Sequence, residues 1–82
     1  MQDTIQTEID QNFDFFQRSL MQILAKHRGE YALIRHRKFV DFYSGPGEAY
    51  RAGLSRFPDE MFSVQEVEDR PAEIGLISLA LD

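Results

Sequence analysis

The sequence predicts a small α+β domain, in which a long N-terminal amphipathic helix is followed by a β-hairpin, a second helix and one or two further strands in an antiparallel sheet. Three observations support this fold class. Apolar residues recur every three or four positions over residues 5–24, two runs rich in β-branched and aromatic residues follow, and a Gly-Pro-Gly turn precedes another helical pattern. The 82 residues have room for a single domain, 1–82, with one core.

A long helix is predicted at about residues 4–27. Asp3 is a suitable N-cap with Gln6 three residues later, and Gly29 is a typical residue after a helix C-terminus. Phe15 and Met21 lie off the main apolar stripe, so the helix is expected to contact something on a second side. The stripe itself has helical spacing and comprises Ile5, Ile9, Phe13, Phe16, Leu20, Ile23 and Leu24.

Two strands are predicted at about residues 30–35 and 38–43, because both runs are rich in β-branched and aromatic residues. Their closeness along the chain predicts an antiparallel hairpin. The turn between them lacks the Asn-Gly or Asp-Gly sequence that a tight type I′ turn prefers. Its type is therefore left open, with His36 as a residue that tolerates a left-handed conformation.

A second helix is predicted at about residues 46–56. Ser44 or Gly45 is expected to cap it, Pro46 suits its first turn, and Pro58 ends it. Small residues on one side of this helix predict close packing against a sheet. That side carries Ala49, Ala52 and Gly53, together with Phe57.

A third strand is predicted at about residues 61–67, with Phe62 and Val64 on one face and Val67 out of phase. The apolar segment at about 74–81 is a candidate for a fourth strand. It is equally compatible with docking across the first helix or with pairing to a second molecule, because an exposed apolar strand favours edge pairing.

Charge is divided unevenly along the chain. A net charge of −5 argues against nucleic acid as a partner, because neutralising phosphates requires clustered Lys and Arg. Residues 26–38 nevertheless carry a local charge of +4, and residues 59–82 carry −6. If the hairpin tip folds beside the end of the first helix, the basic residues would form one anion- or partner-binding patch; otherwise they keep two exposed places soluble. These candidates are Lys26, His27, Arg28, Arg35, His36, Arg37 and Lys38.

No catalytic, cofactor-binding or metal-binding constellation can be read from the sequence. It has two His residues and no Cys, and no spacing typical of metal ligands. The segment Gly45-Pro46-Gly47 lacks the Gly-Lys-Ser/Thr ending of a phosphate-binding loop, and its proline removes one amide donor. We therefore expect a protein that is not an enzyme and that binds neither a metal nor a cofactor.

The chain is expected to be cytoplasmic. The absence of Cys suits a reducing compartment, and residues 1–10 lack the basic and apolar regions of a secretory signal. The longest apolar stretch, 74–81, is far shorter than the roughly 20 residues that a membrane span requires.

About half of the chain resembles a known family. The resemblance is carried by Gly29-Glu30-Tyr31-Ala32-Leu33-Ile34, Val40-Asp41-Phe42-Tyr43, Glu48-Ala49 through Ala52-Gly53, Arg56-Phe57 and Phe62-Ser63-Val64-Gln65-Glu66-Val67. In its order of aromatic and small residues, this part of the chain, about 24–68, resembles small uncharacterised bacterial DUF5678-like proteins. The resemblance implies a unit of hairpin, helix and strand, and brings no catalytic residues. The polar hairpin tip of that family is replaced here by basic residues, so a function at the tip would be particular to this chain.

The expected function is that of a small non-enzymatic protein-interaction module or accessory subunit. It would self-associate as a homodimer, or bind a protein partner, through the apolar helix and the C-terminal segment. The alternative is a charge-driven regulator or inhibitor, antitoxin-like or phage-inhibitor-like, that uses the basic tip or the acidic tail. The candidate interface residues are Phe15, Met21, Ile74, Leu76, Ile77, Leu79 and Leu81.

Overall fold

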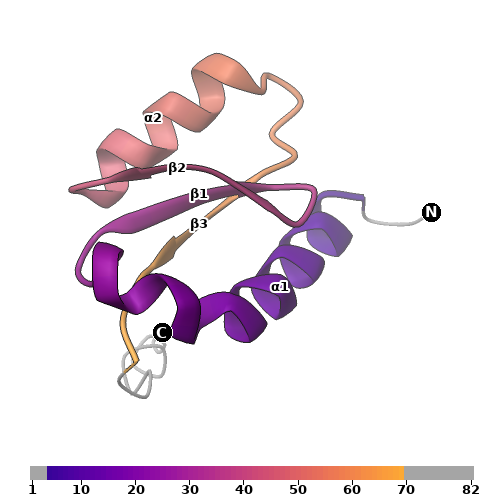
Figure 1. Cartoon of the computed structure of the whole chain (residues 1–82). Coiled ribbons are helices and arrows are strands. Elements are labelled where there is room, and N and C mark those ends of the chain that lie inside the picture. The colour runs from indigo at the N-terminus through magenta and orange to yellow at the C-terminus, as the bar shows by residue number, and fades with distance from the viewer. Residues whose placement is uncertain (1–3, 70–82) are drawn as a thin grey trace, which may run out of the picture.

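The structure, a computed structural model, describes residues 4–69 and confirms the predicted α+β fold (Figure 1). Asp3, expected as a helix cap, and the predicted strand at 74–81 lie outside the described residues. Within the described part of the chain, no helix is long and apolar enough to cross a membrane. The elements are α1 (Thr4–His27), β1 (Tyr31–Arg35), β2 (Lys38–Tyr43), α2 (Pro46–Arg56) and β3 (Ser63–Glu66).

The three strands form one antiparallel sheet in the order β2-β1-β3. On β1, Tyr31 lies opposite Tyr43 of β2 on one side and opposite Glu66 of β3 on the other. The two outer strands therefore run parallel to each other, and α2 connects them by crossing one face of the sheet. The other face is covered by α1, so that the sheet lies between the two helices (Figure 1).

A β-bulge in β2 decides which aromatic residues reach α1. The register shifts along the hairpin, so that Ala32 lies opposite Phe42 whereas Ile34 lies opposite Phe39. Residues three apart on a regular strand point to opposite faces of a sheet, because successive side chains alternate. The extra residue, Val40, places both phenylalanines on the same face as Ala32 and Ile34.

The larger core lies between α1 and the sheet. The ring of Phe15 packs 4.8 Å from that of Phe39, and this contact joins the helix to β2. At the other edge, Val67 belongs to the same core and joins the end of β3 to α1. The buried members are Phe16, Leu24, Ala32, Ile34 and Val67, surrounded by Phe15, Leu20, Ile23, Phe39 and Phe42.

On the opposite face, a glycine allows α2 to approach the sheet closely. A Cβ atom at Gly53 would lie 2.5–2.8 Å from three ring atoms of Phe62, which is itself buried. Ala49, one turn earlier on the helix, is fully buried. The small-residue side predicted from the sequence is therefore the side of α2 that meets the sheet.

A tight turn makes β3 begin at Ser63, two residues later than predicted. The carboxylate of Asp59 accepts a hydrogen bond from the backbone N–H of Met61 at 2.9 Å. Glu60 has a left-handed φ of 62°, and its carbonyl accepts the N–H of Phe62 at 3.0 Å. These local bonds take backbone donors that a longer strand would give to its neighbour.

The end of α1 is tied directly to the strands. Gly29 has a φ of 87°, a conformation that glycine adopts without steric cost. Its N–H donates to the carbonyl of Val67 at 2.9 Å, and the N–H of Val67 donates to the carbonyl of Glu30 at 2.9 Å. The predicted helix stop thus also fixes the chain just after β3.

Candidate functional site

The N-terminal half of α1 turns a polar side toward the sheet. Glu8 and Asn12 are 5% and 0% exposed, whereas Ile5, Ile9 and Phe13 are between 38% and 49% exposed. The apolar stripe seen in the sequence therefore enters the core only in the second half of the helix. The reason is that the hairpin tip lies against the first half, and its backbone groups require hydrogen-bond partners.

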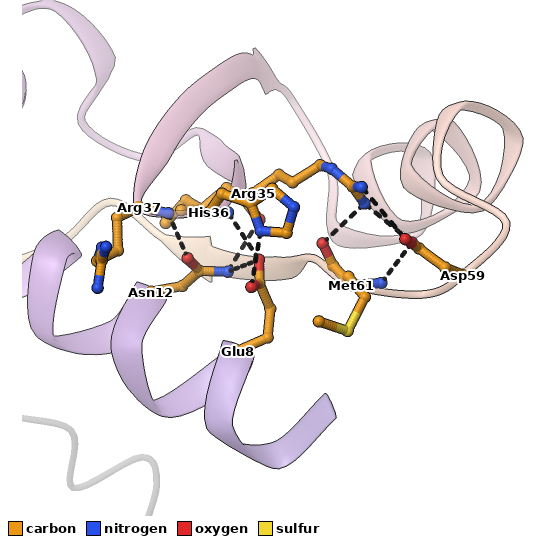
Figure 2. Close-up of polar contacts among 8 residues, drawn as sticks. Glu8, Asn12, Arg35, His36, Arg37, Asp59 and Met61 are labelled. Carbon is orange, nitrogen blue, oxygen red and sulfur yellow. Dashed lines mark hydrogen bonds and ion pairs between the residues drawn. The ribbon is translucent and has the colours of Figure 1, made fainter. Parts of the chain in front are cut away.

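Two helix side chains hold this hairpin tip (Figure 2). The carboxylate of Glu8 accepts the backbone N–H of His36 at 2.6 Å and the Nδ1–H of its ring at 2.9 Å. The ring nitrogen must donate, because a carboxylate only accepts. Asn12 donates to the carbonyl of Ile34 at 3.2 Å and accepts the N–H of Arg37 at 2.8 Å. Asn12 also donates to Glu8 at 3.0 Å, so the contacts form one network, which we call the tip clamp.

The tip clamp explains the unusual turn sequence. His36 and Arg37 have φ values of 51° and 61°, the two positive angles that a type I′ hairpin turn requires. Each left-handed residue other than glycine costs roughly 1–2 kcal/mol. Hydrogen bonds from both turn N–H groups to the clamp offset this cost. The signal in the sequence was the pair Glu8 and Asn12, which are four apart and share one side of the helix, next to the apolar stripe.

The tip clamp should make the fold sensitive to acid. Burial acts to raise the pKa of Glu8, but hydrogen bonds from His36 and Asn12 outweigh it and hold the pKa below its ordinary value of 4.5. A group with a lowered folded-state pKa stabilises the fold above its unfolded-state pKa, and this stabilisation is lost as the pH falls through the folded-state value. We therefore expect the free energy of unfolding to fall as the pH drops below about 4.5.

Urea unfolding followed by circular dichroism at a series of pH values measures this loss. In the Glu8→Gln variant, which keeps the shape of the side chain but does not titrate, the fall below pH 4.5 should be smaller than in the wild type. Part of the fall should persist, because Asp59 has a pKa lowered to about 2. Identical pH profiles for the two proteins would show that Glu8 has no such role.

Arg35 is engaged on the α2 side of the sheet (Figure 2). Its guanidinium donates to the two carboxylate oxygens of Asp59 at 2.9 and 3.2 Å, and to the carbonyl of Met61 at 3.2 Å. It also lies 4.4 Å from the centre of the Phe57 ring. Hydrogen bonds from Arg35 and from the Met61 N–H lower the pKa of Asp59. Arg35 therefore fastens the turn before β3 to the end of β1.

The basic residues at the end of α1 have partners as well. The ring of His27 stacks on that of Phe42 with 3.7 Å between centroids, and its Nδ1 lies 2.6 Å from a carboxylate oxygen of Glu30. Arg28 forms ion pairs with Asp69 at 2.9 Å and with the preceding glutamate at 3.5 Å. The acidic run that follows β3 therefore begins against this basic helix end.

The structure does not join the two basic groups into one patch. The hairpin tip lies beside the first half of α1, whereas residues 26–28 lie at its end. The five residues of β1 run between them and span about 15 Å. Among residues 4–69, the cationic side chains of Lys26, Arg37 and Lys38 have no ion pair. Any binding by the tip would therefore depend mainly on Arg37 and Lys38.

Exposed apolar side chains form a second candidate surface. We call Ile5, Ile9 and Phe13 the apolar flank of α1. Two of the predicted interface residues lie elsewhere: Phe15 is half-buried in the core, and Met21 is 79% exposed on the outward side of the helix. The remaining predicted interface residues are at 74–81, outside the described part of the chain.

The described residues 4–69 contain no group of three or more His, Asp or Glu residues that could hold a metal ion. Comparisons with models of protein families, with curated proteins and with solved structures found no match. The resemblance to DUF5678-like proteins therefore stays a prediction.

Proposed function

We propose that the chain is a small non-enzymatic protein-interaction module that self-associates through the apolar flank of α1 together with residues 74–81. The observation that supports it is the orientation of α1. Two polar residues, Glu8 and Asn12, face the sheet, while the three large apolar side chains of the flank remain exposed. A clustered apolar surface of this kind is typical of an interaction site.

The expected affinity is modest. Fully burying a large apolar side chain contributes about 1.5–3 kcal/mol, and two copies of the chain would contribute six such side chains from their flanks. These side chains are already partly covered, and association costs at least about 4 kcal/mol in lost translational and rotational freedom. The flanks alone therefore leave little net affinity, and self-association in the micromolar range requires residues 74–81 to add to the surface that is buried between the copies.

Sedimentation equilibrium measures this directly. The average mass of the wild-type protein should rise from that of a monomer toward that of a dimer between low and high micromolar concentration. Phe13→Glu, which places a charge in the flank, should keep the protein monomeric. Met21→Glu makes the same kind of change on the outward side of α1 and should leave the dimer intact.

Two results would contradict the proposal. The first is a wild-type protein that stays monomeric at all these concentrations. The second is a dimer that survives Phe13→Glu but is lost with Met21→Glu, since this would place the interface on the outward side of the helix. Circular dichroism of each variant shows whether the fold is retained.

The charge-driven regulator has less support. Arg28 and Arg35 are each paired with acidic residues of the same chain, and the two basic groups lie apart. Binding through Arg37 and Lys38 alone would weaken steeply with salt, because exposed charges are screened. Binding of anionic polymers that is unchanged between low and high salt would exclude this role.

A further inference from the structure

Among the described residues, the outer side of β3 is an unpaired strand edge. β3 pairs with β1 on one side, and within residues 4–69 no strand pairs with its other side. The opposite edge of the sheet, on β2, is blunted by a bulge and by the charged residues Lys38 and Asp41, features that hinder edge pairing. β3 pairs with β1 in an uninterrupted register, so it presents a regular row of backbone groups to a further strand.

The apolar flank of α1 lies on the β3 side of the helix. Phe15 marks the opposite side, because its ring packs on Phe39 of β2. At about 100° per residue, Ile9 and Phe13 lie about 120° and 160° around the helix from Phe15, on the other side of the buried Asn12. α1 runs antiparallel to β1, with its first half at the hairpin tip. The flank therefore borders the free edge of β3.

α2 leaves a matching pair of apolar residues on the other face of the sheet. Tyr50 and Leu54 are 51% and 37% exposed and lie one turn apart. The ring of Tyr50 lies 5.7 Å from that of Phe62, which directly precedes β3. Around α2, both residues lie on the same side of the buried pair Ala49 and Gly53, toward β3. The free edge is thus bordered by exposed apolar side chains from both helices.

Residues 74–81 have the composition that this position requires. A strand covered by helices on both faces has apolar residues on both faces rather than in alternation. After β3, Asp69 forms an ion pair with Arg28 at 2.9 Å, at the end of α1. Residues 70–73, which include Pro71, are enough for a turn that reverses the chain. In an extended segment, one face would carry Ile74, Leu76, Ser78 and Ala80, and the other Gly75, Ile77, Leu79 and Leu81.

We infer that residues 74–81 of the same chain form a fourth strand, antiparallel to β3, that fills the position between the apolar flank of α1 and the pair Tyr50 and Leu54. The sheet order becomes β2-β1-β3 followed by this strand. The new outer edge carries neither proline nor charge between residues 74 and 81. A second copy would meet this edge together with the part of the apolar flank that the strand leaves exposed. Only this last step rests on the proposed function.

Hydrogen exchange on the full chain tests the strand. At concentrations at which the protein is monomeric, the amides of 74–81 that donate to β3 should exchange at least about tenfold more slowly than those of an unstructured peptide. Phe13→Glu and Leu54→Glu border the strand from opposite faces, and each should remove much of this protection. Met21→Glu, the matched control, should not. Unprotected amides throughout 74–81 would overturn the inference.

Engineered disulfides separate pairing within a chain from pairing between chains, because the sequence has no cysteine of its own. Gln65→Cys is combined in turn with Ile74→Cys, Gly75→Cys, Leu76→Cys, Ile77→Cys, Ser78→Cys or Leu79→Cys, so that both faces of the strand are sampled, and at least one pair should oxidise to a monomeric, disulfide-closed chain. Asp41→Cys on β2, at the far edge, should form no such bond with the same partners. Disulfides only between isotopically distinct copies, or none at all, would contradict pairing within the chain.

The two proposals can fail separately. A protein that sediments as a monomer with protected amides at 74–81 would contradict self-association and leave the fourth strand standing. A dimer with unprotected amides at 74–81 would support self-association and contradict the fourth strand.

Discussion

Asn12→Ala is expected to lower the free energy of unfolding by about 2–4 kcal/mol, since the change removes a partner from the buried carbonyl of Ile34 and from the partly buried N–H of Arg37. The amide of Asn12 bonds the carbonyl of Ile34 at 3.2 Å and Glu8 at 3.0 Å, and its oxygen accepts the N–H of Arg37 at 2.8 Å. The side chain is fully buried, so water cannot replace it without a local opening of the hairpin tip. Urea unfolding at neutral pH measures the effect.

Gln11→Ala is the matched control. Gln11 precedes Asn12 on the same helix and is exposed, so its replacement should change the free energy of unfolding by less than about 0.5 kcal/mol. Equal effects of the two changes would show that the tip clamp contributes nothing to stability.

A third variant tests the reason for the clamp. Arg37→Gly removes a side chain from a left-handed residue with a φ of 61° and should stabilise the protein by about 1 kcal/mol. A turn that prefers this conformation by itself depends less on Asn12. Asn12→Ala should therefore cost less in the Arg37→Gly protein than in the wild type, and strictly additive effects would argue against this coupling.

Gly53→Ala should destabilise the protein by about 1–3 kcal/mol, although alanine favours a helix more than glycine does. The added Cβ would lie 2.5–2.8 Å from three ring atoms of Phe62. That ring is buried and also packs near Tyr50 and Phe57, with centroids 5.7 and 6.3 Å away, so it cannot move aside freely. The thermal and urea midpoints should both fall.

Gly47→Ala on the same helix provides the contrast. There the nearest atom to a new Cβ is the Nη1 of Arg51 at 3.4 Å, at the end of a flexible side chain. This change should be neutral or stabilising by up to about 1 kcal/mol. Phe62→Leu should restore part of the stability lost in Gly53→Ala, because it removes the ring atoms that clash. A Gly53→Ala protein as stable as Gly47→Ala would mean that α2 can shift away from the sheet at little cost.

Local patterns were sufficient for the types and order of the elements. The stop at Gly29, the proline in the first turn of α2 and the small residues of that helix act within a few positions of the chain, so they can be read without knowing the fold. The residue at which β3 begins was harder to predict from the sequence, because the turn at residues 59–62 competes with the strand for backbone hydrogen bonds.

The candidate surfaces were only partly predictable. The sequence showed that the tip was basic and that α1 was widely apolar, but it did not show that Arg35 would pair with Asp59, 24 residues away. It also did not show that the length of β1 would separate the hairpin tip from the end of α1. Ion pairs between distant residues depend on the topology of the sheet, and a topology of this kind leaves no local pattern.

By itself, the sequence determined an α+β chain with a long amphipathic helix, a hairpin and a second helix with a close-packing side. Tertiary structure decided which side of α1 faces the sheet. Glu8 accepts hydrogen bonds from the hairpin tip, and Asn12 both donates to it and accepts from it, with partners 22–28 residues away along the chain. Those backbone groups must be satisfied when they are buried, and this requirement outweighs the local tendency of Ile5, Ile9 and Phe13 to turn inward. The same hydrogen bonds stabilise a type I′ turn made of a histidine and an arginine. The orientation of α1 that they impose leaves the apolar flank available for a strand or a partner.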